Sequence, residues 1–160
     1  MAIGVGDKFP SGVFVKMNEE GPGPITTEEF FGGKRVVLFG VPGAFTPPCS
    51  EKHLPGFVER AAEIKTKGVD IIACLSVNDV FVMNAWGKDQ NAGDSVEMLA
   101  DGSAALTKEL GTVLDLTDRG LGVRSSRYSM IVDDGVVTTI NLEEGGAFEV
   151  SGADTILSQL

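Results

Sequence analysis

The side chains best suited to nucleophilic chemistry in this 160-residue chain are two cysteines and one histidine. Cys49 lies in Val41-Pro-Gly-Ala-Phe-Thr-Pro-Pro-Cys-Ser50, between a strand-sized apolar run and an amphipathic helical pattern. Thr46 is a favoured N-cap and Pro47 suits the first helical position, so Cys49 falls in the first helical turn. Unpaired N–H groups and the helix dipole there favour a thiolate, which can attack a peroxide oxygen and become a sulfenic acid. The spacing predicts a reactive Cys49; an inert core cysteine is the alternative.

His53 and Cys74 are the two other candidates. His53 lies four residues after Cys49 on the same helix face, so a Cys–His pair and a cysteine hydrolase form an alternative hypothesis. Cys74 lies in an apolar run at residues 70–76, which favours a packed core thiol. The cysteines form no Cys-x-x-Cys pair and no zinc-ligand cluster, so we expect no structural metal and no disulfide scaffold. We expect no cofactor either, because sulfur can perform the redox chemistry itself.

Two apolar runs and the helix between them must position Cys49. Residues 35–41 and 69–77 are short, apolar and rich in β-branched side chains, which predicts buried strands. The helix between them, from about residue 47 to 67, has one apolar face, so the three elements predict a right-handed unit with parallel strands. Strands at 128–132 and 136–140 flank Asp134-Gly135, which suits a type I′ hairpin turn. The prediction is one α/β domain over residues 1–160, with a mixed β-sheet flanked by helices and a thioredoxin-like fold.

Turn and cap residues suggest the remaining elements. Gly-Pro-Gly-Pro at residues 21–24 predicts a loop, and Thr26 with Glu29 predicts a capping box for a short helix at 27–31. Asn78 or Asp79 can cap a helix that we expect to bury Phe81, Val82, Ala85 and Trp86. Ser151 with Asp154 predicts the cap of a last helix at 152–159.

The net charge of −10 argues against nucleic-acid binding, because an acidic surface repels phosphate backbones. No apolar run approaches the roughly 18 residues that span a membrane, so no membrane partner is expected. The first residues, Met-Ala-Ile-Gly-Val-Gly-Asp, lack the features of a secretory signal. These features predict a cytoplasmic protein; a mature organellar form with its leader removed would look the same.

The Cys49 segment resembles a known active-site signature. Gly-Val-Pro-Gly-Ala-Phe-Thr-Pro-x-Cys-Ser, followed by x-x-His-x-Pro, is similar to that of the type II peroxiredoxins, and the plant-type members of that family share a second cysteine 25 residues later. The resemblance continues in Ser76-Val-Asn-Asp-x-Phe-Val-Met-x-Ala-Trp86 and in Leu99-Ala-Asp-Gly-Ser103. Gly120-Leu-Gly-x-Arg-Ser125, Arg127-Tyr-Ser-Met130 and Val132-Asp-Asp-Gly135 extend it over nearly the whole chain.

The resemblance implies a role for each site residue. Cys49 corresponds to the peroxidatic cysteine and Pro42 to the proline that shields it from water. Thr46 corresponds to the threonine whose hydroxyl bonds the thiolate and the peroxide. Arg127 corresponds to the arginine that stabilises the thiolate and polarises the O–O bond. Arg124 is a competing arginine, but two strand residues three apart point to opposite faces, and Arg127 matches the family pattern.

The family also implies a reaction and its partners. It predicts an antioxidant thiol peroxidase for hydrogen peroxide and alkyl hydroperoxides, regenerated by glutaredoxin with glutathione or by thioredoxin. It predicts a homodimer with Phe45 near the contact, and a His53 that holds the active-site helix. Cys74 is a possible resolving cysteine; the animal branch's resolving position corresponds to Glu149-Val-Ser-Gly152, which lacks cysteine. A hydrolase and a non-enzymatic redox sensor or holdase stay open as alternatives.

Overall fold

The apolar runs around the candidate site form the centre of a seven-stranded sheet in the computed structural model, which describes residues 2–160. The strand order is β2-β1-β5-β4-β3-β8-β9. Strand β3 (Arg35–Val41) pairs in parallel with β4 (Ile71–Ser76), which pairs in parallel with β5 (Glu97–Ala100). Strand β8 (Tyr128–Asp133) pairs antiparallel with the other side of β3. The sheet is therefore mixed, as the sequence predicts.

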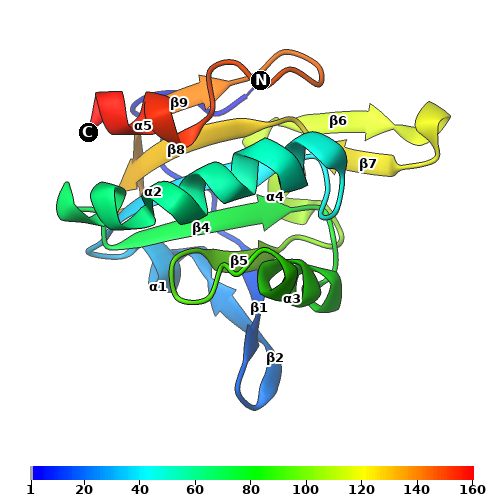
Figure 1. Cartoon of the computed structure of the whole chain (residues 1–160), viewed down its shortest axis with the longest axis horizontal. Coiled ribbons are helices and arrows are strands. Elements are labelled where there is room, and N and C mark those ends of the chain that lie inside the picture. Colours follow the sequence, from blue (N-terminus) through cyan, green and yellow to red (C-terminus); the bar gives the residue numbers. More distant parts are fainter. Residues whose placement is uncertain (1) are drawn as a thin grey trace.

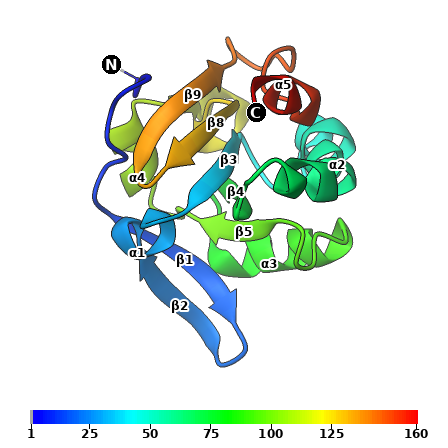
Figure 2. The same cartoon turned by 90° about the vertical axis from the view of Figure 1, so that its left-hand side faces the viewer.

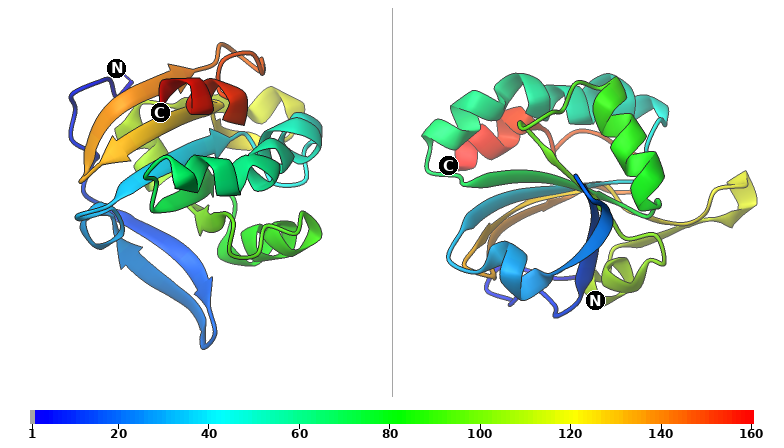
Figure 3. Two further views of the ribbon diagram at one scale, coloured as in Figure 1. Left: turned by 60° about the vertical axis from the view of Figure 1, so that its left-hand side comes forward. Right: turned by 90° about the horizontal axis from the view of Figure 1, so that it is seen from below.

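Helices cover both faces of this sheet (Figure 3). Helices α2 (Leu54–Thr66), α3 (Val80–Asp89) and α5 (Ala153–Gln159) lie on one face, and α1 (Thr27–Phe31) and α4 (Ala105–Leu110) lie on the other. Side chains alternate along β3, so Val37 and Phe39 pack into the core beneath α2, whereas Val36 and Leu38 pack into the opposite core. Cys49 and Cys74 both belong to the core beneath α2.

The loop predicted at residues 21–24 is wrong, because this segment is part of strand β2 (Gly21–Thr26). It pairs only with β1 (Val13–Asn18), and the two form a hairpin at one end of the sheet (Figure 2). Proline has no N–H to donate to a ladder, so it is tolerated on an edge strand. Pro22 and Pro24 occupy such an edge. The cap of the following helix by Thr26 is confirmed, since Thr26 accepts from the Glu29 N–H. The Glu29 carboxylate accepts from the Thr26 hydroxyl, whereas in a full capping box it would accept from the Thr26 backbone N–H.

The hairpin before the last helix is also confirmed. Strand β9 (Val136–Leu142) pairs antiparallel with β8, and Asp134 and Gly135 have φ values of 47° and 82°, as a type I′ turn requires. A separate two-stranded ribbon, which the sequence did not suggest, consists of β6 (Val113–Leu116) and β7 (Gly122–Ser125) joined through a 3-10 turn, η2 (Thr117–Arg119). It projects from the body of the molecule (Figure 1) and leads directly into Arg127.

Helix α3 starts as expected but buries a different face. Asp79 caps it by accepting a hydrogen bond from the Val82 N–H at 2.9 Å. At 100° per residue, this start directs Trp86 inward and places Phe81 on the opposite side of the helix. Phe81 is 64% exposed, so its predicted burial is wrong, as is that of Ala85. The buried positions are Val80, Met83, Trp86 and Gly87.

Among residues 2–160, no helix combines the length and apolar character that crossing a membrane requires.

Candidate active site

The segment after β3 turns into α2 through a π-helical turn, η1 (Cys49–His53). The Leu54 N–H donates to the Cys49 carbonyl, five residues back. Pro55 accounts for the wide turn, because a proline inside a helix cannot donate to the carbonyl four residues back and its ring clashes with it. Thr46 does not cap a backbone N–H as predicted. Its hydroxyl lies 2.6 Å from the Gly43 carbonyl oxygen and 3.0 Å from Cys49 Sγ.

Cys49 Sγ lies between two hydrogen-bonding side chains. Besides the Thr46 hydroxyl, Arg127 Nη2 donates to the sulfur at 3.3 Å. Cys49 has no exposed surface and Arg127 is 2% exposed, so the contact is shielded from water. A cation in a water-poor environment stabilises a thiolate more than a thiol. The structure thus brings together Cys49, Thr46 and Arg127, although 78 residues separate the cysteine from the arginine.

His53 contacts the arginine and not the sulfur. Its Nε2–H donates to the Ser151 carbonyl at 2.9 Å, and its Nδ1 accepts from Arg127 Nη1 at 3.1 Å. Burial, and then the charge of Arg127, lower the pKa of His53 from 6.5 to about 3. The ring is therefore neutral at physiological pH, and both of its nitrogens are engaged. This geometry argues against the hydrolase hypothesis, in which His53 would take a proton from Cys49.

Comparison with known proteins identifies the family. The Redoxin family model matches residues 4–157. Peroxiredoxin-2B of Arabidopsis thaliana is 52% identical over 159 residues, which cover 99% of this chain and 98% of the relative. The chain belongs to the peroxiredoxin family. Chloroplastic Peroxiredoxin-2E of the same plant is 50% identical over 163 residues, covering 99% of this chain and 70% of the relative.

A solved peroxiredoxin structure has the same fold. The crystal structure of reduced Prx3 in complex with hydrogen peroxide from Vibrio vulnificus shares 52% sequence identity and superposes with a TM-score of 0.95. The match covers 98% of each chain. The predicted thioredoxin-like fold and the resemblance to the plant-type type II peroxiredoxins are therefore confirmed. As a member of this family, the protein is a thiol peroxidase.

Arg124 contacts Pro42 in the loop that leads from β3 to Cys49. Arg124 Nη1 donates to the Pro42 carbonyl at 3.4 Å and its Nε donates to the Leu121 carbonyl at 2.8 Å. Arg124 therefore contacts the backbone of the loop before Cys49, whereas Arg127 reaches the sulfur. Gly43 leaves space for this contact, because a Cβ there would approach Arg124 Nη1 to 2.7 Å.

Cys74 lies in β4, buried in the core. Complete burial, and then the proximity of Cys49, raise the pKa of the Cys74 thiol well above its ordinary value. Its backbone position is fixed on both sides, since it pairs with Phe39 of β3 and with Met98 of β5. Within residues 2–160, no three His, Cys, Asp or Glu side chains gather in a group that could hold a metal ion.

The sequence reasoning missed two supporting contacts. Asn78, considered only as a helix cap, accepts a hydrogen bond from the Ala44 N–H at 3.0 Å and so ties the active-site loop to the end of β4. Trp86, expected only as a core residue, donates its indole N–H to Ser50 Oγ at 3.0 Å. Local sequence contains no signal for either contact, because each joins segments more than 30 residues apart.

Proposed function

We propose that this peroxiredoxin reduces hydrogen peroxide and alkyl hydroperoxides through a sulfenic acid on Cys49. The observation that carries the proposal is the position of Cys49 Sγ, 3.0 Å from the Thr46 hydroxyl and 3.3 Å from Arg127 Nη2. Both groups are donors that can stabilise a thiolate before the reaction and negative charge during it. A buried core cysteine without a function would not need a buried arginine aimed at its sulfur.

The proposed reaction is a two-electron transfer from sulfur to the peroxide. The Cys49 thiolate attacks the terminal oxygen of the hydroperoxide, the S–O bond forms, and the O–O bond breaks. The leaving oxygen takes the proton of the hydroperoxide and departs as water or an alcohol. The sulfenate left on Cys49 then takes a proton from solvent and becomes the sulfenic acid. Arg127 and the Thr46 hydroxyl stabilise the charge that develops on the two oxygens. In this scheme Pro42 limits the contact of the sulfur with water.

An outside thiol completes the proposed cycle. Glutaredoxin with glutathione, or thioredoxin, attacks the sulfenic sulfur, releases water and forms a mixed disulfide that a second thiol reduces. The raised pKa of Cys74, which burial and the nearby Cys49 cause, argues against its acting first, because a thiol that is not ionised is a poor nucleophile. Cys74 is a possible resolving cysteine only after local unfolding of β4.

We propose that the protein is a homodimer. Each subunit would be one domain formed by residues 1–160. The family match over residues 4–157 supports the single domain. Phe45 in the active-site loop is 53% exposed, and an exposed aromatic side chain supports a contact there. We place it in the cytoplasm; the chloroplastic relatives make a mature organellar form the alternative.

The decisive experiment is stopped-flow oxidation of the reduced protein by hydrogen peroxide. Trp86 is the only tryptophan, and its hydrogen bond to Ser50 couples its fluorescence to the turn that carries Cys49. We expect second-order oxidation far faster than that of free cysteine, and none in Cys49→Ser. A wild-type rate no better than free cysteine would overturn the proposal and leave the redox-sensor alternative. Acylation of Cys49 that depends on His53 would instead support the hydrolase.

A further inference from the structure

The loop between β9 and α5, residues 143–152, closes on a buried carboxylate. Glu143 is 6% exposed, and its Oε2 accepts three backbone N–H groups, from Glu149 at 2.8 Å, Val150 at 2.9 Å and Ser151 at 3.0 Å. The Ser151 hydroxyl donates to the same oxygen at 2.7 Å. Successive N–H groups that converge on one anion form a nest, which fixes the local backbone. The sequence prediction that Ser151 caps the last helix is therefore wrong, because the Ser151 hydroxyl forms its hydrogen bond with Glu143.

This loop reaches the proposed active site at three points. The Glu143 N–H donates to the Arg127 carbonyl at 3.0 Å. The Ser151 carbonyl, next to the nest, is the acceptor for His53 Nε2–H. The Phe148 ring lies 5.0 Å from the His53 ring and 5.8 Å from Arg127 Cζ. The loop therefore contacts both partners of the Arg127–His53 hydrogen bond.

Arg127 needs such support because it has no carboxylate partner. Within residues 2–160 its guanidinium forms no salt bridge, and its buried Nε has no hydrogen-bond acceptor. Its two other nitrogens donate to His53 and Cys49. The direction of the guanidinium therefore depends on where the His53 ring is held, and the Ser151 carbonyl holds that ring.

We propose that Glu143 is a positioning residue for the peroxidase site: its carboxylate fixes Ser151, Ser151 fixes His53, and His53 aims Arg127 at Cys49 Sγ. The inference rests on the proposed role of Cys49. It assigns the loop at residues 143–152 a supporting function, in the region where the sequence lacks a resolving cysteine.

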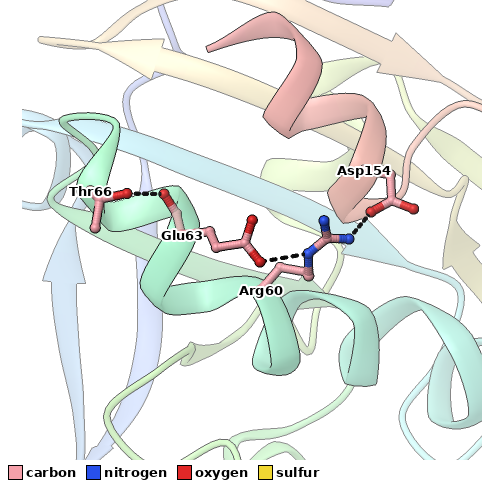
Figure 4. Close-up of polar contacts among 4 residues, drawn as sticks. All are labelled: Arg60, Glu63, Thr66 and Asp154. Carbon is pink, nitrogen blue, oxygen red and sulfur yellow. Dashed lines mark hydrogen bonds and ion pairs between the residues drawn. The ribbon is translucent and has the colours of Figure 1, made fainter.

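A second polar attachment lies just after the loop, at the start of α5, and it is weaker (Figure 4). Arg60 of α2 forms ion pairs with Asp154, at the start of α5, and with Glu63. The Asp154 side chain is 84% exposed, so water and salt screen this pair. The buried contacts of Glu143 are not screened in that way. Of these two polar attachments, the one to Glu143 therefore contributes more to the position of Ser151.

The pH at which half of the Cys49 thiolate forms separates a positioning role of Glu143 from a direct effect of its charge, because the two change this pH in opposite directions. Glu143→Gln keeps the shape of the side chain but removes a negative charge. Loss of that charge alone would favour the Cys49 thiolate and lower the pH at which half of it forms. Loss of the positioning contacts would weaken the Arg127–Cys49 contact and raise that pH. A rise of this pH in Glu143→Gln therefore supports the positioning role.

The experiment compares wild type, Glu143→Gln and the matched control Glu144→Gln, which removes the same charge from an exposed neighbour. The thiolate is followed by its ultraviolet absorbance against pH; Cys74 does not contribute, since burial and then Cys49 raise its pKa. We expect Glu143→Gln to raise the midpoint by about one pH unit, a tenfold change in the thiol-to-thiolate ratio. Its oxidation by hydrogen peroxide should slow by about tenfold or more, as misplaced groups cause. Glu144→Gln should match wild type within about twofold.

A folded Glu143→Gln protein, judged by near-ultraviolet circular dichroism, with the wild-type midpoint and rate would overturn the inference. If Glu143→Gln does not fold, Ser151→Ala tests the inference in its place. This variant keeps the backbone carbonyl that accepts from His53 and removes one hydrogen-bond donor to Glu143. A smaller rise of the midpoint supports the inference, and an unchanged midpoint overturns it. A slow wild-type protein would instead refute the role of Cys49, and the midpoints, which need no peroxide, would still test the positioning.

Discussion

Acid should destabilise this protein through His53, its only histidine. Burial, and then the charge of Arg127, lower the pKa of His53 in the folded state from 6.5 to about 3. Between these values the unfolded chain binds a proton that the folded protein does not, so stability falls as the pH falls. The slope approaches about 1.4 kcal/mol per pH unit. Lowering the pH from about 7.5 to about 5.0 should therefore cost about 2 kcal/mol of unfolding free energy.

This magnitude does not depend on the exact pKa of His53, provided that it stays well below 5. Three carboxyl groups, those of Glu28, Asp115 and Glu143, have a lowered pKa in the folded protein. Hydrogen bonds from Ser11 and from its own backbone lower the pKa of Glu28, and hydrogen bonds from Thr117 lower that of Asp115. Burial raises the pKa of Glu143, but its four hydrogen bonds together outweigh burial and lower it. The ordinary pKa values of these three groups, 4.5, 3.8 and 4.5, already lie below pH 5, so most of the change between about pH 7.5 and about pH 5.0 belongs to His53.

Urea unfolding followed by Trp86 fluorescence measures the effect, at one protein concentration because a dimer would make stability depend on it. In His53→Gln, the unfolding free energy should be lower than in wild type but should no longer change between about pH 7.5 and about pH 5.0. The ring resonances of His53 in a nuclear magnetic resonance titration should stay constant down to about pH 4. A ring that titrates near pH 6.5, or an equal pH dependence in His53→Gln, would refute the reasoning.

Two further predictions concern the sulfur. Thr46→Val removes the hydroxyl 3.0 Å from Cys49 Sγ and should slow oxidation by hydrogen peroxide by about 100-fold, whereas Thr46→Ser keeps the hydroxyl and should stay within a few fold in the same stopped-flow assay. Equal rates for the two variants would contradict a role for the hydroxyl. Cys74→Ala should retain turnover with glutathione and glutaredoxin in a coupled peroxidase assay, because the Cys74 thiol is buried and un-ionised. Loss of turnover together with accumulation of the Cys49 sulfenic acid would show that Cys74 resolves it.

The sequence alone determined the features that depend on neighbours along the chain. The apolar runs predicted β3 and β4, and Asp134-Gly135 predicted the hairpin turn, because each follows from local conformational preference. The three-residue spacing of Thr46 and Cys49 brought their side chains together within one turn. The motif around Cys49 was also sufficient to identify the family. Local patterns were misleading where the context differed, as at the prolines of the edge strand β2 and at the exposed Phe81.

Only the tertiary structure decided how the site is supported. Arg127 reaches Cys49 across 78 residues because β8 pairs with β3, a register that no local pattern specifies. The protonation state of His53 follows from its burial and from the nearby arginine, both of which are consequences of packing. The Glu143 carboxylate has no distinguishing sequence signal, yet the fold surrounds one of its oxygens with four donors. Local sequence sets which groups are available for the chemistry, whereas long-range packing sets their direction and charge.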